Sequence, residues 1–267
     1  MSRIGLVAGF GKLPIIFSNI AKQKGDTVIA FALKGVTYPQ LGDHVAKIHW
    51  LEWGNLKMSL LLLAAERIQK IAMLGKVNKD IFFKDDSKFD DDARKIFEKI
   101  KDKKDYAIFN EVSAALSKLG IEVLDSTVYL KCLLPAKGTL TKREPTKDES
   151  ADINYGRQVA SALAEFDIGQ TVAVREKTII AVEAVEGTDE AIKRAGGLTN
   201  GGFVVVKVAR PNQDMRFDVP LVGLDTLKVL IESGGKALAL EEKKTFLMDR
   251  EDLINLADAK GISVVVI

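Results

Sequence analysis

Apolar and polar positions in the first half of the chain follow the order expected for strands separated by helices. Short, mainly apolar runs predict strands over residues 4–8, 27–33, 45–50, 71–74, 105–109 and 122–125. Segments with apolar residues at every third or fourth position predict helices over residues 13–24, 55–69, 91–101 and 110–119. This alternation predicts an α/β domain with a parallel sheet that has helices on both faces.

The pattern changes in the second half. Between about residues 131 and 149, prolines, glycine and a dense mixture of charged residues interrupt the periodicity, which is typical of a linker. Beyond this segment, the pattern predicts strands over residues 171–175, 178–183, 203–208, 215–219 and 263–267. It predicts helices over residues 155–165, 225–232 and 250–259, and a short helix capped by Thr188. We therefore expect a Rossmann-like N-terminal domain over residues 1–132 and a separate α/β domain with a mixed sheet over residues 133–267, of which 133–150 is linker-like.

Composition and charge narrow the functional classes. The chain has 267 residues, of which 47% are hydrophobic, so it can bury a substantial core. Its net charge of +2 is too small to make nucleic acid or an anionic membrane the dominant partner. The single cysteine, Cys132, favours a reducing compartment, and no apolar run has the length of a signal peptide or a membrane span. We expect a cytoplasmic protein, and peripheral contact with a membrane stays open.

Histidine usage restricts the chemistry further. Both histidines, His44 and His49, lie in the N-terminal half. The second half therefore cannot hold a histidine-containing zinc site or a Ser-His-Asp triad. Acid–base or metal chemistry there must use carboxylates, lysines or backbone groups, and Mg²⁺ is the natural metal for such oxygen ligands.

A glycine-containing turn follows the first predicted strand, with the sequence Gly9-Phe10-Gly11-Lys12. Glycines at this position let backbone N–H groups approach a phosphate. The dinucleotide-binding fingerprint fails, because Pro14 stands where its third glycine belongs. Gly75 and Lys76 follow the fourth strand, where a lysine would point into the ligand crevice of such a sheet. A tight turn explains the first motif equally well, and a solvated lysine is the commoner explanation of the second.

Four acids lie within eight residues of the second half: Glu183, Glu186, Asp189 and Glu190. A threonine cap at Thr188, after the turn at Gly187, and acids in the first helical turn explain part of this stretch as helix stabilisation. They do not explain Glu183 and Glu186, which would repel their neighbours unless a cation or a basic group lies among them.

Charged and apolar residues alternate in a second stretch, between Pro211 and Pro220. In a strand, Asp214, Arg216 and Asp218 would share one face, and the apolar residues between them would face the core. The charged face is either a solvated outer surface, the usual case, or the lining of a site that holds a metal and a phosphate.

Taken together, these motifs resemble the LpxI-type UDP-2,3-diacylglucosamine pyrophosphatases over nearly the whole chain. The specific blocks are Glu-Gly-Thr-Asp at 186–189 and Arg-Phe-Asp-Val-Pro at 216–220. Other blocks along the chain resemble the family in the same order: Gly75-Lys76-Val77, Asp125-Ser126-Thr127, Gly138-Thr139-Leu140, Asp167-Ile168-Gly169-Gln170, Lys193-Arg194 and Lys207.

The resemblance implies an N-terminal domain that helps to hold a UDP-sugar and a C-terminal hydrolase domain. It implies a Mg²⁺-dependent step of lipid A synthesis, in which water attacks the sugar-side phosphorus of UDP-2,3-diacylglucosamine to give UMP and 2,3-diacylglucosamine 1-phosphate. It also implies that the essential acid lies in the second specific block, at Asp218. The expected partner is a lipid-linked UDP-sugar and not nucleic acid; a homodimer and a location at the inner membrane stay open.

The predicted site combines both lines of reasoning. Asp214 and Asp218 are expected to bind Mg²⁺ or activate water, with Glu186 and Asp189 as supporting acids. The expected substrate-binding residues are Gly9, Phe10, Gly11, Lys12, Gly75, Lys76, Gln170, Gly187, Thr188, Arg194, Lys207 and Arg216. Two alternatives are an NADP-binding oxidoreductase, with Lys34 near a 2′-phosphate, and a non-catalytic nucleotide-sugar-binding protein.

Overall fold

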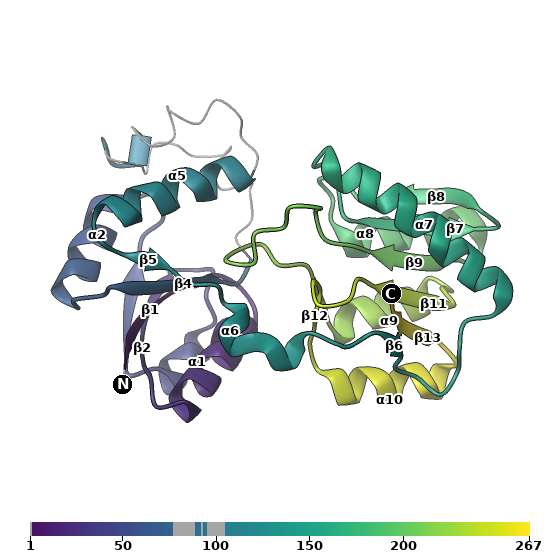
Figure 1. Cartoon of the computed structure of the whole chain (residues 1–267), viewed down its shortest axis with the longest axis horizontal. Helices are drawn as coiled ribbons and strands as arrows, with labels where there is room; N and C mark the ends of the chain where they lie inside the picture. Colours follow the sequence, from purple (N-terminus) through teal and green to yellow (C-terminus); the bar gives the residue numbers. More distant parts are fainter. Residues whose placement is uncertain (1, 77–88, 92, 95–104) are drawn as a thin grey trace. The chain divides into compact units, whose positions relative to one another are not determined.

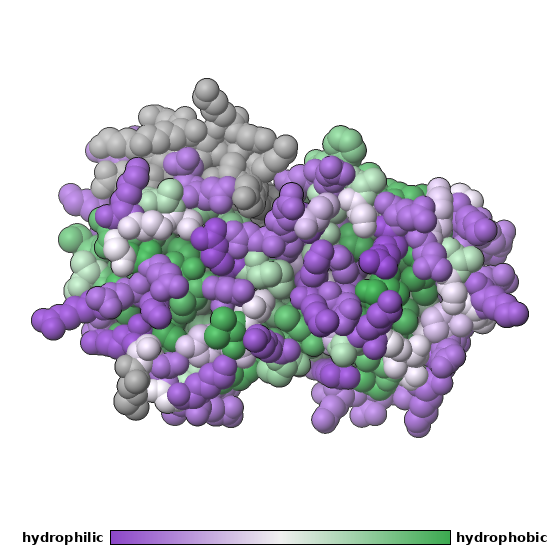
Figure 2. Space-filling view, in the orientation of Figure 1, coloured by the Kyte–Doolittle hydropathy of each residue, from purple (hydrophilic) through white to green (hydrophobic). Residues whose placement is uncertain are grey.

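The computed structural model describes residues 2–76, 89–91, 93–94 and 105–267 (Figure 1). The chain forms two compact units, each with its own sheet. Unit 1 contains Met1–Lys131 together with the short segment Met215–Asp218, and unit 2 contains Cys132–Asp214 and Val219–Ile267. Hydrophilic side chains (purple) cover much of the face seen in Figure 2, with smaller apolar areas among them.

Unit 1 is built on a parallel sheet of five strands in the order β3-β2-β1-β4-β5. Its described elements are β1 (Arg3–Ala8), α1 (Leu13–Gln23), β2 (Thr27–Leu33), η1 (Pro39–His44), β3 (Lys47–Leu51), α2 (Leu56–Ala65), β4 (Lys70–Leu74), α5 (Asp105–Lys118), β5 (Glu122–Val123) and α6 (Thr127–Leu130). The strand order reverses between β1 and β4, which is where open sheets of this kind bind their ligands.

Both faces of this sheet are covered, which explains why its strands are apolar on both sides. On one face, Phe31 of β2 packs with Leu63 of α2 and Leu116 of α5. On the other face, α1 packs against β2, and Phe17 of α1 is completely buried. Figure 1 shows α1 and α5 on opposite sides of the sheet. The expected parallel α/β architecture is confirmed.

The predicted strand over residues 105–109 is wrong, because this segment is the first part of helix α5. Its short apolar run suits a strand or a helix equally well, and the helical spacing of Val112 and Leu116 extends it as a helix. The predicted helix over residues 91–101 and Val77 of the second glycine motif fall largely outside the described residues.

Unit 2 contains a six-stranded mixed sheet in the order β6-β13-β11-β9-β7-β8 and a separate parallel pair, β10-β12. The central strands β13, β11 and β9 are parallel, and β6, β7 and β8 pair antiparallel. Its elements are η3 (Lys131–Leu133), β6 (Gly138–Thr139), α7 (Lys147–Glu165), β7 (Thr171–Arg175), β8 (Thr178–Val182), α8 (Thr188–Thr199), β9 (Val204–Lys207), β10 (Leu221–Val222), α9 (Leu224–Glu232), β11 (Ala237–Leu240), β12 (Phe246–Leu247), α10 (Arg250–Lys260) and β13 (Ser263–Val266). The expected mixed-sheet domain is confirmed.

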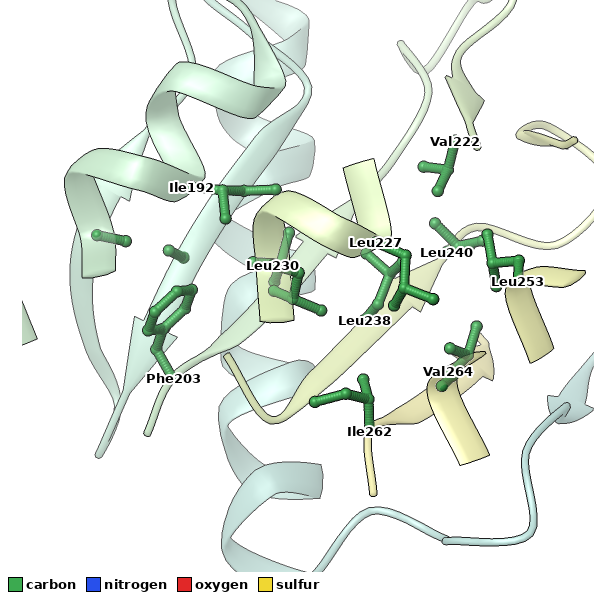
Figure 3. Packing of buried hydrophobic residues seen from close by; sticks show 14 of the residues in the cluster. Ile192, Phe203, Val222, Leu227, Leu230, Leu238, Leu240, Leu253, Ile262 and Val264 are labelled. Carbon is green, nitrogen blue, oxygen red and sulfur yellow. The ribbon is translucent and has the colours of Figure 1, made fainter. Parts of the chain in front are cut away.

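Helix α7 covers one face of this sheet, and α8, α9 and α10 cover the other. Figure 3 shows Leu227 and Leu230 of α9 in one apolar cluster with Ile192 of α8 and Leu238 of β11. On the α7 side, a Cβ at Gly156 would lie 2.8 Å from side-chain atoms of Val174 and Val206, so only glycine allows this close approach. No helix among the described residues is long and apolar enough to cross a membrane.

Two expectations for this half require correction. Residues 215–219 form turns rather than a strand, because Asp218 adopts a left-handed backbone conformation with φ 51°. The polar segment 133–150 contains β6 and the start of α7, where Thr146 and Glu149 form a reciprocal capping box. In residues 133–150, the charged residues and prolines therefore coincide with the start of a helix as well as with the connection between the units. The buried strand β11 was not expected, since its alternating alanines and leucines carry no strand preference.

Candidate functional site

The two glycine motifs of unit 1 meet at the carboxyl edge of its sheet. Gly9–Lys12 follows β1 and Gly75-Lys76 follows β4, and these strands are neighbours. The Phe10 amide donates to the Lys76 carbonyl at 2.8 Å, and the Lys76 amide donates to the Phe10 carbonyl at 2.9 Å. The two glycine motifs therefore contact each other at this edge.

Backbone packing explains why glycines stand here. A Cβ at Gly9 would lie 2.8 Å from the Gly75 carbonyl oxygen, and a Cβ at Gly75 would lie 2.7 Å from the Gly9 carbonyl carbon. The Gly9 amide donates to the Leu74 carbonyl at 2.8 Å. The N–H groups of Gly9 and Phe10 are therefore taken by the neighbouring loop and do not form a phosphate cradle. The start of α1, after Gly11, and the exposed side chains of Lys12 and Lys76 lie at the same edge.

An aromatic pair lies at the same edge of unit 1. Phe10 is 52% exposed, although it is a large apolar residue. Its ring contacts the ring of Tyr38 edge to face, with 4.9 Å between the ring centroids. Tyr38 was not among the expected site residues, because nothing in the sequence shows that the loop after β2 reaches the turn after β1.

In unit 2, three of the expected residues, Gln170, Thr188 and Lys207, lie together with Thr171 and Glu183 where β8 and β9 end and β7 begins. Because β7 is antiparallel to both neighbours, its first residue lies at the edge where they end, and Thr171 is paired with Lys207. Helix α8 starts at the same edge. The residues brought together here are Gln170, Thr171, Glu183, Thr188 and Lys207.

A buried pair of opposite charges forms the centre of this group. The Lys207 Nζ donates to the Thr188 Oγ1 at 2.8 Å and to the Thr171 Oγ1 at 3.1 Å, and lies 3.7 Å from the Glu183 Oε2. The Glu183 carboxylate accepts from the Thr188 hydroxyl at 2.7 Å and from the Gln170 amide at 3.3 Å. The side chains of Lys207 and Glu183 are only 8% and 13% exposed.

The environment of Glu183 favours its charged form. Burial acts to raise the pKa of its carboxyl, but the charge of Lys207 and hydrogen bonds from Thr171, Thr188 and Gln170 lower the pKa below its ordinary value. Glu183 is therefore an ionised carboxylate at neutral pH. In the sequence, helix capping did not explain the position of Glu183. Its partner, Lys207 of β9, can be identified only when the order of the strands is known.

The predicted threonine cap of α8 is wrong. Gly187, with φ 87°, occupies the cap position, and Thr188 is the first helical residue. The Thr188 hydroxyl bonds the Glu183–Lys207 pair instead of capping the helix. In the first turn of α8, Asp189 accepts a hydrogen bond from the Thr226 hydroxyl at 2.9 Å.

Arg194 is the exposed cation of this edge. Its Nη2 donates to the Val182 carbonyl at 2.6 Å and to the Glu186 Oε1 at 2.8 Å, and its side chain is 51% exposed. Because both described contacts use one nitrogen, the other donors of the guanidinium can take an oxyanion. Glu186 thus orients Arg194, and it also accepts from the Ala184 amide at 3.1 Å.

The loop between β9 and β10 carries the remaining acids. Asp214 belongs to unit 2, whereas the segment Met215–Asp218 packs within unit 1. Phe217, which is 4% exposed, stacks on Phe109 of α5 with 4.3 Å between ring centroids and 12° between planes. The Ser126 hydroxyl donates to the carbonyl of Met215 at 3.4 Å. Asp218 is thus held by contacts of unit 1.

Arg216 lies in the same segment. Its Nη1 lies 3.4 Å from the Ser113 Oγ, and its guanidinium is 5.7 Å from the centroid of the Phe217 ring. The shared strand face expected for Asp214, Arg216 and Asp218 does not exist. Phe217, which the alternation pattern assigned to the core face of a strand, instead stacks on Phe109 of α5.

The acids Asp214 and Asp218 are the residues considered for a magnesium ion. Among the described residues, no three acidic, histidine or cysteine side chains lie together as a ready metal cage. Mg²⁺ is usually bound through one or two carboxylates together with the phosphates of a substrate, so a complete cage is not needed. Asp214 and Asp218, four positions apart in the sequence, are carboxylates of the type that such binding uses.

Comparisons with known proteins agree with this division. The family model for the LpxI N-terminal domain matches residues 3–133, and that for the LpxI C-terminal domain matches residues 136–265. A protein of Caulobacter vibrioides, UDP-2,3-diacylglucosamine pyrophosphatase LpxI, is 28% identical over 278 residues, which cover 99% of this chain and 97% of that protein.

Two solved structures are remotely similar to this chain. A biotin carboxylase complex from Campylobacter jejuni matches at 10% identity and a TM-score of 0.28, over 73% of this chain and 41% of that chain. N5-carboxyaminoimidazole ribonucleotide synthetase from Thermotoga maritima matches at 16% identity and a TM-score of 0.24, over 70% and 43%. The chain spans less than half of either protein, and neither likeness is strong enough to support an inference. The two domain matches and the full-length relative together show that the chain belongs to the LpxI family.

Proposed function

We propose that this protein hydrolyses the pyrophosphate bond of UDP-2,3-diacylglucosamine, giving UMP and 2,3-diacylglucosamine 1-phosphate for lipid A synthesis. The observation that carries the proposal is the relative with this named activity, which aligns with both units of the chain rather than with one. The gathering of Arg194, Glu186 and the start of α8 at one sheet edge supports it, since a pyrophosphate needs cationic and N–H donors.

Each unit has its own task in this proposal. Residues 1–132 hold the UDP part of the substrate, with Lys12, Lys76 and Phe10 at the carboxyl edge of the sheet. Residues 133–267 supply Arg194 and the first turn of α8 to the phosphate that is attacked. The two acyl chains place the substrate in a membrane, so we propose that the protein acts at the inner membrane surface as a peripheral protein.

The reaction adds one water to the sugar-side phosphorus and breaks its bond to the bridging oxygen. That oxygen leaves with UMP, and the oxygen of water stays in the sugar phosphate. Asp218 accepts a proton from the attacking water or holds the metal together with Asp214. Arg194 and Arg216 bind the charge that develops on the phosphate oxygens. Bound Mg²⁺ would neutralise pyrophosphate charge and so stabilise the leaving UMP.

Phosphorus NMR of the purified protein with UDP-2,3-diacylglucosamine and Mg²⁺ tests this function. We expect the diphosphate signals to be replaced by those of two monophosphates. Mass spectrometry after incubation in ¹⁸O water should find the label in the sugar phosphate. Substrate that binds and stays intact would contradict the proposal, and label in UMP would mean attack at the other phosphorus. Omission of Mg²⁺, with a chelator present, should abolish turnover.

A further inference from the structure

The buried location of Lys207 conflicts with direct substrate binding. Its ammonium group has three N–H donors. Two of them are used by the hydroxyls of Thr171 and Thr188, and the third faces the Glu183 carboxylate across 3.7 Å. The Lys207 side chain is 8% exposed, whereas that of Arg194 is 51% exposed. Arg194 is therefore the cation that can meet a phosphate at this edge, and Lys207 is satisfied inside the protein.

The Thr188 hydroxyl is likewise committed. Its one hydrogen goes to the Glu183 Oε1 at 2.7 Å, and its oxygen accepts from the Lys207 Nζ at 2.8 Å. It has no second hydrogen for a phosphate oxygen. Glu183 also accepts from the Gln170 amide. This network joins the start of β7, the end of β8, the start of α8 and the end of β9 around one pair of buried charges.

The surrounding backbone leaves little room for movement. A Cβ at Gly169 would lie 1.9 Å from the Glu183 carbonyl oxygen, so the loop before β7 packs directly against the backbone of Glu183. Arg194 donates to the Val182 carbonyl at the end of β8 and to Glu186, on either side of Glu183 in the sequence. A shift of Glu183 would thus displace the segment that fixes the guanidinium of Arg194 and the first turn of α8.

We propose that Glu183 and Lys207 are a pair of positioning residues, which hold Thr188 and the first turn of α8 so that Arg194 and the helix N–H groups can bind the pyrophosphate. The inference rests on the proposed function, and it assigns to Glu183 a role that its position in the sequence did not reveal. It also moves Lys207 and the Thr188 hydroxyl from the substrate-binding set to the support of that set.

Because the charges of Glu183 and Lys207 cancel, removing both can distinguish a supporting role from direct substrate binding by Lys207. Removal of one partner leaves the other as an uncompensated buried charge, whereas replacement of both by uncharged residues of similar volume removes the conflict. In Glu183→Gln with Lys207→Met, the carbonyl oxygen of the introduced glutamine can accept from the backbone N–H of Gln170, and its NH2 group can donate to the Thr188 oxygen, which Lys207 no longer occupies. If Lys207 contacted the substrate directly, the added Glu183→Gln substitution would not restore the activity lost in Lys207→Met.

The experiment measures kcat and KM for UDP-2,3-diacylglucosamine in the wild type, the two single variants and the double variant. We expect each single variant to lose about 10–100-fold in kcat/KM, the usual effect of removing a group that orients a binding residue. The double variant should recover to within about tenfold of the wild type. Lys193→Met, which removes an exposed lysine of α8 paired with Glu190, is the matched control and should keep wild-type activity.

Amide hydrogen exchange at residues 184–190 measures directly how firmly the start of α8 is held, and it does not depend on turnover. Exchange should be faster in the single variants and return toward the wild-type rate in the double variant, so the inference can be judged even if the wild type proves inactive on this substrate. A folded double variant that stays as inactive as Lys207→Met, with wild-type exchange at the start of α8, would overturn the inference and return Lys207 to the substrate. If a single variant fails to fold, the double variant alone decides.

Discussion

Replacement of Phe217 should release Asp218, the acid that we propose to be essential, from the contacts that position it. Phe217 directly precedes Asp218, is 4% exposed, and stacks on Phe109 of α5. Asp218 itself adopts a left-handed conformation, so the direction of its carboxylate depends on the turn that this segment forms. Loss of the Phe217 ring would therefore release the carboxylate from its position while leaving the carboxylate in the chain.

The size of the effect follows from the burial of the ring. Truncation of a buried phenylalanine to alanine costs about 3–5 kcal/mol, and a stacked aromatic pair contributes about 0.5–1.5 kcal/mol beyond its buried area. If this energy holds the segment Met215–Asp218 in place, Phe217→Ala should lower kcat by about 100-fold or more, since each 1.4 kcal/mol is tenfold. Phe217→Leu keeps most of the apolar contact and should lower kcat by only about 2–10-fold.

Steady-state kinetics with UDP-2,3-diacylglucosamine, together with thermal unfolding of each variant, measures the effect. Phe109→Leu should resemble Phe217→Leu, and the two substitutions combined should cost less than the sum of their separate effects, because they break one contact. A Phe217→Ala protein with wild-type kcat and an unchanged Tm would refute the idea that this stack positions Asp218.

Three further predictions concern unit 2. Gly169→Ala should lower the free energy of unfolding in urea by about 1–3 kcal/mol, because its methyl group would overlap the Glu183 carbonyl. Gly197→Ala on α8, with open space at its Cβ, is the control and should be neutral or slightly stabilising. Arg194→Met should lower kcat/KM by about 10–100-fold, as expected for lost charged hydrogen bonds of about 1.5–3 kcal/mol, and unchanged kinetics would exclude Arg194 from the site. Because the pKa of Glu183 is lowered in the folded protein, its ionised form contributes stability above the ordinary value of 4.5, and this contribution is lost as the pH falls through the lower native pKa. The difference in free energy of unfolding between wild type and Glu183→Gln should therefore narrow on acidification, and a constant difference would contradict the ionised state.

Strand–helix alternation was sufficient to predict the architecture of unit 1. Its sheet is buried on both faces, so each central strand is a continuous apolar run. The contact of Gly9 with Gly75 was not predicted, because it depends on β1 and β4 being neighbours in the sheet. Local pattern failed at residues 105–109, where a short apolar run carried no information about its period. It failed again at 215–219, where alternation resembled a strand but Asp218 turns the chain.

The site in unit 2 was only partly predictable from the sequence. Arg194 and Glu186 were selected as a cation and an acid of the same region, and the structure pairs them. The contact between Glu183 and Lys207 could not be predicted, because it depends on β7 lying between β8 and β9. Composition and spacing describe which charges exist, whereas strand order determines which of them are buried together.

Turnover by Asp218→Asn tests the central claim most directly. Asparagine keeps the size of the side chain and tolerates the left-handed backbone at this position, so the fold and the affinity for UDP-2,3-diacylglucosamine should remain. We predict that hydrolysis in the presence of Mg²⁺ becomes undetectable while the substrate still binds. Wild-type turnover by this variant would contradict the assignment of Asp218 as the essential acid of a pyrophosphate hydrolase.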